Sequence, residues 1–308
     1  MLGIWVIALQ ACGPGPTTTP APPRPTTPHA LSRSMARTPP DASPAAASRE
    51  ASEAIGVDIC EAGLTDAARQ NDESLRRLAF APFRRAETGW EVYATLMAHE
   101  IGTRCGPGSA GFASAWAAWQ SAHGRSADGI VDPATFASMA ATWQARRPFV
   151  AASQGLCPAP PPETSLIPIP ADQSYGGKTM LLRPAALAAY DRMVASARAE
   201  GFMVGADPRL MTVFSAYRSP ADDAARCARD GNCQGVVRAT CSPHRTGLAV
   251  DLNLGAAQGY GPDSSDDPNR LYIAQGAAYR WMVANAGRFG FVPYPFEPWH
   301  WEWAQGAN

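Results

Sequence analysis

Two histidines and an aspartate in the C-terminal half of the chain have the residue types of a catalytic metal site. His244 and Asp251 lie in CSPHRTGLAVDLN, and His300 lies in FEPWHWEW near the end of the sequence. Two imidazoles and a carboxylate leave one coordination position of zinc open for water. Because bound zinc lowers the pKa of water to ~7, a nearby carboxylate can accept its proton. The chemistry that these residue types predict is metal-assisted hydrolysis.

Two predicted strands and a turn position these three residues. In GLAVDLNLG, strand alternation places Asp251 on the face opposite the leucine and valine side chains. Gly247 permits the sharp turn that folds His244 back beside Asp251. In WHWEW the tryptophans share one face, and His300 points away from them. A histidine among aromatic residues is often a hydrogen-bonded core residue, so spacing alone leaves both interpretations of His300 open.

Two glutamates near His300 compete for the role of general base. Alternation alone favours Glu302, which shares a strand face with His300. Pro298 changes this assignment, because it lacks an N–H and fixes φ, so strand pairing should begin after it. Glu297 then lies on the preceding turn and can lean over the metal. Glu302 is instead expected to orient a ligand.

Three cysteines and a histidine have the spacing of a competing metal site. Cys227, Cys233, Cys241 and His244 give the spacing C-x5-C-x7-C-x2-H, as in small nucleic-acid-binding fingers. Such a finger needs reducing surroundings and a basic surface. The net charge is −1, with 26 basic and 27 acidic residues, and nothing in this balance points to nucleic acid. The finger would also leave Asp251 and His300 unexplained.

Two paired motifs resemble those of a known enzyme family. S-x-H-x-x-G-x-A-x-D, followed far downstream by E-x-W-H, is similar to the zinc-dependent D-Ala-D-Ala carboxypeptidases, which include the vancomycin-resistance carboxypeptidases and dipeptidases. The resemblance covers roughly residues 174–303. The matching residues are Ser242, His244, Gly247, Ala249, Asp251, Glu297, Trp299 and His300.

This resemblance implies a role for each matching residue. One Zn²⁺ ion is held by His244, Asp251 and His300, and Glu297 is the catalytic base. Arg218, in the segment SAYRS, binds substrate and stabilises the transition state. The further substrate contacts that we expect are Ser242, Tyr217 and Trp299.

The implied reaction is hydrolysis of the terminal D-Ala of peptidoglycan stem peptides. An L,D-carboxypeptidase, a cross-link endopeptidase and a non-catalytic wall-binding lipoprotein remain alternatives. The chain departs from the family at Ser219–Asp223, where relatives often carry a glutamine. Residues 226–240 and 255–270 are expected to be additional elements at the rim of the site, where they would change which peptide end fits.

The fold predicted for residues 165–304 is α+β, a peptidase domain with a small antiparallel sheet and flanking helices. Two of these helices are predicted over residues 181–201 and 277–290, and they end at Gly201 and Gly290. Residues 57–150 are predicted to form a small all-α domain. In it, SAGFASAWAAWQSAHG is a helix capped by Ser109 and ended by Gly124, and Asp132-Pro133 begins another helix. This segment resembles the helical peptidoglycan-binding domain of cell-wall hydrolases; a generic helical bundle is the alternative. The resemblance rests on Trp119, Gln120, Gly124, Asp128, Gly129, Val131, Pro133 and Thr135.

The N-terminal residues predict export and a lipid anchor. Residues 1–12 form an apolar run in which Leu9-Gln10-Ala11-Cys12 resembles a lipobox, with Cys12 acylated, although no Lys or Arg precedes the run. Residues 13–52 are rich in Pro, Thr and Ala and are expected to be a flexible tether. We expect an exported monomer in the periplasm or cell envelope, held at the membrane through Cys12.

The cysteine count also indicates an oxidising compartment. Apart from Cys12 the chain has six cysteines, an even number that fits three disulfides. Proximity in the sequence favours Cys60 with Cys105, and Cys227 with Cys233 or Cys241. Spacing cannot choose among the 15 pairings that six cysteines allow.

Overall fold

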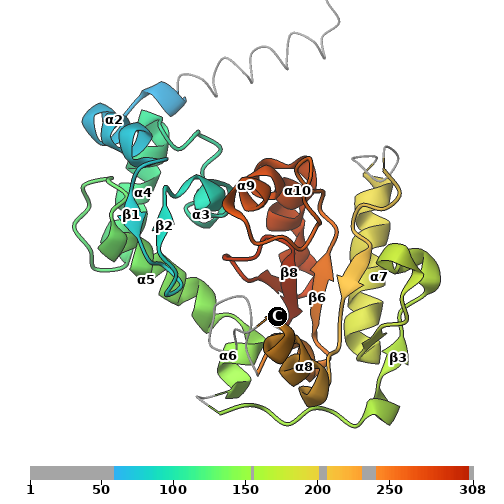
Figure 1. Cartoon of the computed structure of the whole chain (residues 1–308). Coiled ribbons are helices and arrows are strands. Elements are labelled where there is room, and N and C mark those ends of the chain that lie inside the picture. The colour runs from blue at the N-terminus through green and yellow to red at the C-terminus, as the bar shows by residue number, and fades with distance from the viewer. Residues whose placement is uncertain (1–58, 154–155, 201–206, 231–240, 305–308) are drawn as a thin grey trace, which may run out of the picture. The chain divides into compact units, whose positions relative to one another are not determined.

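The structure, a computed structural model, describes residues 59–153, 156–200, 207–230 and 241–304 (Figure 1). These residues all belong to one compact unit, residues 48–308. The expected signal (1–12), tether (13–52), Cys12 and Cys233 lie outside the described residues. Among the helices of the described part, none is both long and apolar enough to cross a membrane.

The N-terminal segment, residues 59–153, contains the helices that the sequence predicts. The Ser109 hydroxyl accepts a hydrogen bond from the Phe112 N–H, and Asp132 with Thr135 forms a capping box. A short antiparallel hairpin, which the sequence analysis did not predict, is inserted between the helices. The elements are α2 (Thr65–Ser74), β1 (Ala79–Phe80), β2 (Glu87–Thr88), η1 (Glu91–Tyr93), α3 (Ala94–Glu100), α4 (Ala110–Ala122), α5 (Pro133–Ala145) and α6 (Pro148–Ser153).

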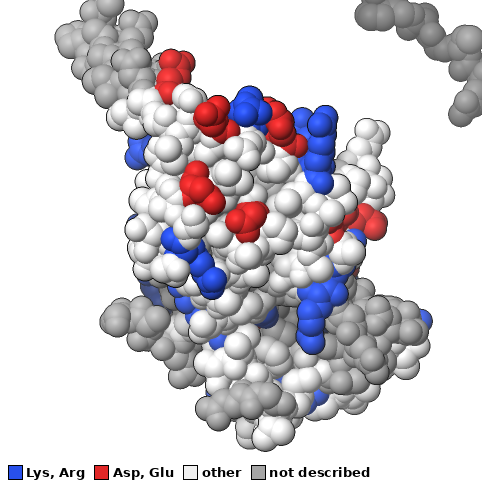
Figure 2. Space-filling model, turned by 90° about the vertical axis from the view of Figure 1, so that its left-hand side faces the viewer, with Lys and Arg blue, Asp and Glu red and all other residues white. Residues whose placement is uncertain are grey.

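The outer face of this segment carries both signs of charge. In Figure 2 most of the face shown is uncharged, and acidic and basic residues are interspersed over it. This distribution agrees with the net charge of −1. It gives this face no dominant potential that would attract a polyanion.

The C-terminal part combines a four-stranded antiparallel sheet with helices, which confirms the α+β prediction. The strand order is β5-β6-β8-β7, and β3 and β4 form a separate hairpin. The strands are β3 (Ile167–Pro168), β4 (Leu181–Leu182), β5 (Val213–Ser215), β6 (Ala249–Leu252), β7 (Phe291–Pro293) and β8 (His300–Trp303). The helices are η2 (Glu163–Ser165), η3 (Ala171–Gln173), η4 (Tyr175–Gly177), α7 (Pro184–Ala199), α8 (Pro220–Asp230), η5 (Pro243–Thr246), α9 (Asp267–Gln275), α10 (Ala277–Asn285) and η6 (Ala286–Phe289).

Several element ends differ from those expected. The predicted helix over 181–201 begins only at Pro184, because Leu181 and Leu182 pair with β3. It ends at Ala199, and the expected stop at Gly201 lies outside the described residues. The helix expected to close at Gly290 ends at Asn285 and continues as a 3₁₀ turn, after which Gly290 has φ +82°. A left-handed glycine ends the turn there, as predicted.

One buried apolar cluster joins the N-terminal segment to the sheet. Trp90 and Phe136 of the N-terminal segment belong to the same cluster as Val250 and Trp301 of the sheet. The Thr95 hydroxyl also donates a hydrogen bond to the carbonyl oxygen of Ala274 on α9. The two parts of the described chain therefore share a core, and the N-terminal segment is packed against the sheet that carries the expected site.

The disulfides agree with the sequence in part. Cys60 pairs with Cys105, as predicted, and Cys157 pairs with Cys241. Pairing of Cys227 with Cys241 is therefore wrong, because a residue of the linker between the two parts takes Cys241 instead. Cys227 is also disulfide-bonded. The Cys157–Cys241 bond ties the linker to the loop that leads into η5, the element that carries His244.

We predict that removing this bond with Cys157→Ala/Cys241→Ala lowers the free energy of unfolding by about 2–5 kcal/mol and reduces the hydrolytic activity that the family resemblance implies. Urea denaturation measures the first effect, and turnover of a peptide substrate measures the second. The control is Cys60→Ala/Cys105→Ala, which removes a bond of the same kind whose cysteines do not line the site. Equal loss of activity in both variants at matched folded fraction would contradict the prediction.

Candidate metal centre and active site

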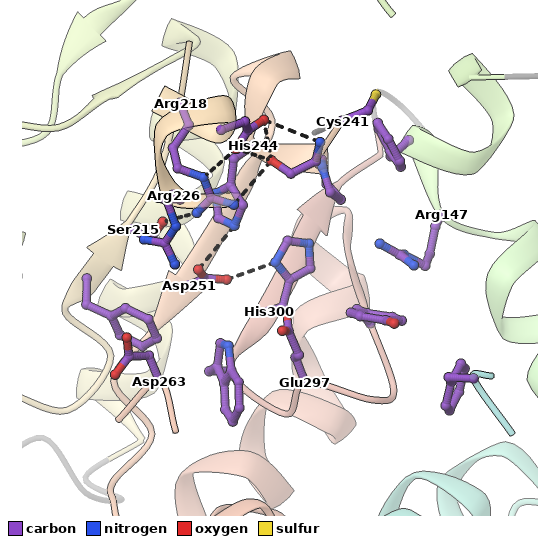
Figure 3. Close-up of a pocket in the computed structure, with 18 of the residues that line it drawn as sticks. Arg147, Ser215, Arg218, Arg226, Cys241, His244, Asp251, Asp263, Glu297 and His300 are labelled. Carbon is purple, nitrogen blue, oxygen red and sulfur yellow. Dashed lines mark hydrogen bonds and ion pairs between the residues drawn. The ribbon is translucent and has the colours of Figure 1, made fainter. Parts of the chain in front are cut away.

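A cavity of about 590 Å³ collects the predicted site residues (Figure 3). The C-terminal part contributes Arg218, Ser242, His244, Asp251, Glu297, Trp299 and His300 to its wall. The N-terminal segment contributes Pro82, Phe83, Arg84, Gln144, Arg147 and Phe149. Tyr217 is not among the described residues that line the cavity.

The three expected metal ligands converge on one point. Strand pairing places Asp251 of β6 directly opposite His300 of β8. The Asp251 carboxylate lies between the two imidazoles, with Oδ2 3.1 Å from His244 Nε2 and Oδ1 2.8 Å from His300 Nδ1 (Figure 3). One ligand atom of each residue lies within 4.8 Å of the other two, and all three side chains are buried. The group could hold a metal ion.

In each histidine, one ring nitrogen faces away from Asp251. The surroundings of that nitrogen indicate which nitrogen of the ring can bind a metal. His244 Nδ1 lies 2.7 Å from the carbonyl oxygen of Ala216, which can only accept a hydrogen bond. Nδ1 therefore carries the proton, and Nε2 presents its lone pair toward Asp251. His300 Nε2 is buried, makes no hydrogen bond and lies 3.4 Å from Glu302 Oε1. Two imidazole nitrogens and a carboxylate are a donor set that fits zinc.

The charges in the site also favour a cation. Burial lowers the pKa of His244 to about 4, so this ring is neutral at pH 7. Burial would lower the pKa of His300 too, but the hydrogen bond to Asp251 and the Glu302 carboxylate raise it to about 9. Burial opposes ionisation of Asp251, yet His244 and His300 hold its pKa well below the usual range. An ionised Asp251 beside the neutral His244 ring gives a divalent cation both a negative charge and an imidazole lone pair.

Glu297 lies at the wall of the cavity on the turn before β8. The strand begins at His300, after Pro298, as the proline predicts. The peptide N–H of Glu297 donates to Tyr294, and its carbonyl accepts from His300, so the turn is internally hydrogen-bonded. Desolvation raises the pKa of the Glu297 carboxyl to about 7. A carboxyl group with a pKa near the working pH is suited to accept and return a proton.

Arg218 is held in the cavity wall by three polar side chains. Its Nε donates to Asp223 Oδ1 at 2.9 Å, Nη1 to Ser215 Oγ at 2.8 Å and Nη2 to Ser242 Oγ at 3.2 Å. Ser242 in turn donates to the buried Asp223 carboxylate. The sequence pattern did not identify Asp223 as a partner of Arg218. The five-residue spacing across the start of α8 carries no recognised motif that would have identified it.

The cysteine–histidine metal site considered from the sequence is wrong. Cys241 is bonded to Cys157, and Cys227 is also oxidised to a disulfide. Oxidised cysteines offer no thiolate to a metal. His244 is directed to Asp251 instead.

Comparison with known proteins assigns the C-terminal part to a family. Residues 179–306 match the profile of VanY, D-alanyl-D-alanine carboxypeptidase. This region is a VanY-type domain. It contains Arg218, His244, Asp251, Glu297 and His300, whereas the N-terminal segment lies outside the match.

Two solved structures are similar to parts of this chain. The LD-carboxypeptidase LdcB is 23% identical over 40% of this chain and 59% of its own, with a TM-score of 0.29. DacB from Streptococcus pneumoniae D39 is 17% identical over 48% of this chain and 85% of its own, with a TM-score of 0.28. None of the curated proteins matches the chain significantly. This chain thus spans less than two thirds of LdcB.

The raised pKa of Glu297 predicts a pH-dependent stability of the metal-free VanY-type domain. Because the folded pKa of about 7 exceeds the ordinary value of 4.5, the contribution is complete below the ordinary value and is lost as pH rises through about 7. Between about pH 5 and about pH 8, the metal-free wild type should lose more thermal stability than Glu297→Gln. Differential scanning calorimetry after chelation measures the difference. The exposed Glu73→Gln should follow the wild type, and parallel curves for all three proteins would contradict the prediction.

Proposed function

We propose that the protein is a zinc-dependent carboxypeptidase that removes the terminal D-Ala from peptidoglycan stem peptides. The observation that carries this proposal is the buried His244–Asp251–His300 group with Glu297 at the same cavity, inside a VanY-type domain. A structural histidine cluster would need no neighbouring carboxyl group with a pKa near neutrality and no open cavity.

Each residue of the site has its own proposed role in hydrolysis. His244, Asp251 and His300 would hold Zn²⁺, which would act as a Lewis acid toward the scissile carbonyl and the attacking water. Glu297 accepts a proton from the water as its oxygen bonds to the carbonyl carbon. As the C–N bond breaks, Glu297 returns that proton to the leaving amino group of D-Ala. After one turnover Glu297 is again a carboxylate, ready to accept a proton from the next water.

Arg218 is the proposed group for the charged parts of the substrate. Its guanidinium lines the cavity and is positioned by Asp223, Ser215 and Ser242. A positioned guanidinium can bind a terminal carboxylate or stabilise the oxygen on which negative charge develops. Trp299 and Ser242 are proposed to contact the peptide at the cavity wall, and Tyr217 to contact it outside the cavity.

The disulfides and the match to the VanY family support a location outside the cytoplasm. We further propose that Cys12 is acylated and that the N-terminal segment contacts peptidoglycan. Attachment at the membrane and wall would keep the enzyme close to its substrate and raise its effective concentration there.

We predict that the zinc-loaded protein releases one D-Ala from a stem pentapeptide and that a chelator abolishes release. Glu297→Gln should lower kcat by about 10²–10⁴-fold while zinc stays bound, because this residue moves the proton without holding the metal. Mass spectrometry of defined muropeptides measures the product, and elemental analysis measures the zinc.

The muropeptide that is cleaved distinguishes the alternative functions. Cleavage of tetrapeptides in place of pentapeptides would make the protein an L,D-carboxypeptidase, and cleavage of dimers would make it an endopeptidase. If the zinc-loaded protein cleaves none of them, the proposal fails and a non-catalytic wall-binding role replaces it.

For Arg218, we predict that Arg218→Lys lowers kcat/KM by roughly tenfold to a hundredfold, the value of one or two charge-assisted hydrogen bonds. Lysine keeps a positive charge beside the buried Asp223 but cannot donate from a fork of three nitrogens. Steady-state kinetics on the pentapeptide measures the change. Arg209→Lys is the matched control, since Arg209 pairs with Asp207 at the surface. Unchanged kinetics in Arg218→Lys would remove Arg218 from substrate binding.

A further inference from the structure

The N-terminal segment reaches the active site through a buried arginine. Arg147 lies between α5 and α6, outside the VanY-type domain, and its side chain is buried. Its Nη2 and Nε lie 2.5 and 2.7 Å from Glu302 Oε1. The peptide N–H of Phe149 donates to the other carboxylate oxygen at 3.0 Å. The N-terminal segment therefore provides three donors to one carboxylate of β8.

Glu302 also lies beside an expected metal ligand, His300. Its Oε1 lies 3.4 Å from His300 Nε2, the ring nitrogen that faces away from Asp251. In Figure 3, Arg147 and Asp251 lie on opposite sides of the His300 ring. A carboxylate at the outer nitrogen fixes the orientation of a ligating imidazole and the nitrogen that carries its proton. With the proton held at Nε2, Nδ1 is free to bind a metal beside Asp251.

Further contacts hold Arg147 itself in place. Nη1 donates to Gln144 Oε1 at 2.7 Å, and the guanidinium carbon lies 4.0 Å from the centre of the Tyr294 ring. Exposed ion pairs contribute little, but Arg147 and Glu302 are both buried, so removing the arginine leaves a buried charge without its partner. This geometry couples the N-terminal segment to His300 more rigidly than a surface contact would.

A second buried arginine links the N-terminal segment to the turn that carries Glu297. Arg270 Nε donates to the carbonyl oxygen of Phe296 at 2.9 Å, directly before Glu297. Its Nη1 lies 3.2 Å from Glu87 Oε2, and its Nη2 donates to the Tyr93 hydroxyl at 2.8 Å. Tyr93 donates in turn to Glu87, so two N-terminal residues orient the arginine that holds this turn.

We propose that the N-terminal segment, residues 59–153, is an integral part of the active site and that Arg147 is a positioning residue for His300. The inference rests on the proposed metal-dependent function. The segment also forms one side of the substrate cavity, where Phe83 and Arg84 stand with Gln144 and Phe149. The VanY-type domain alone therefore lacks one wall of the cavity and the arginine that holds Glu302 beside His300.

The test is Arg147→Met in the full chain, with metal affinity as the first readout. Competition with a chromophoric chelator should show about 10–100-fold weaker Zn²⁺ binding, and the visible absorption of the Co²⁺-loaded protein should change, because His300 is no longer held. The matched control is Arg146→Met. Arg146 precedes Arg147, pairs with Glu100 and is half exposed, so its loss should leave both readouts unchanged.

A second variant covers the case in which Arg147→Met does not fold. Arg147→Met/Glu302→Gln removes both charges together, so no unpaired charge is buried, yet it still lacks the carboxylate beside His300. It should fold and still bind Zn²⁺ more weakly than the wild type. Wild-type affinity and an unchanged Co²⁺ spectrum in the folded variants would overturn the inference.

These readouts separate the inference from the proposed function. If the variants lose Zn²⁺ affinity but the wild type cleaves no muropeptide, the positioning role stands and the carboxypeptidase assignment fails. If the wild type cleaves muropeptides and the variants keep its Zn²⁺ affinity, the assignment stands and the positioning role fails.

Discussion

In the central strand pair of the sheet, Asp251 on β6 faces His300 on β8, and Ala249 faces Glu302. Strand side chains alternate between faces, so a slip of one residue would turn His300 and Glu302 away from the aspartate together. This register places the His300 imidazole between the Asp251 and Glu302 carboxylates. The buried Val250 and Leu252 of β6 and Trp301 of β8 specify that register from the other face of the sheet.

His244 reaches the same point by a turn whose backbone conformation favours glycine. Gly247 has φ +66°, and a Cβ there would lie 2.9 Å from a methyl carbon of Leu166. A side chain at this position would be strained and crowded at once. The turn lets η5 lead directly into β6, so His244 returns over the strand that carries Asp251 and its Nδ1 meets the carbonyl oxygen of Ala216. Backbone geometry thus sets the histidine tautomer on this side of the site, whereas the group beside the outer nitrogen of His300 is the Glu302 carboxylate, at 3.4 Å.

Local chemistry made part of this arrangement predictable from the sequence. Pro298 predicted the start of β8 and the position of Glu297, and the caps at Ser109 and Asp132 predicted the helices of the N-terminal segment. The β1–β2 hairpin escaped prediction because strands of two residues show no periodicity. Asp223 and the partners of the two buried arginines escaped because their contacts depend on tertiary packing. Arg147 and Glu302 are 155 residues apart, and no local pattern encodes such a pair.

The position of the buried Arg147–Glu302 and Arg270–Glu87 pairs suggests a reason for their charge. Burying an arginine with a glutamate costs desolvation that an apolar pair of similar size would avoid, so such pairs are weak contributors to stability. The apolar cluster that spans the same interface, including Trp90 and Phe136, already supplies a non-directional driving force for docking. Apolar packing does not determine which nitrogen of an imidazole carries a proton, but a carboxylate held by several donors does. The buried charges at this interface meet the sheet beside His300 and Glu297, where such directionality has a chemical use.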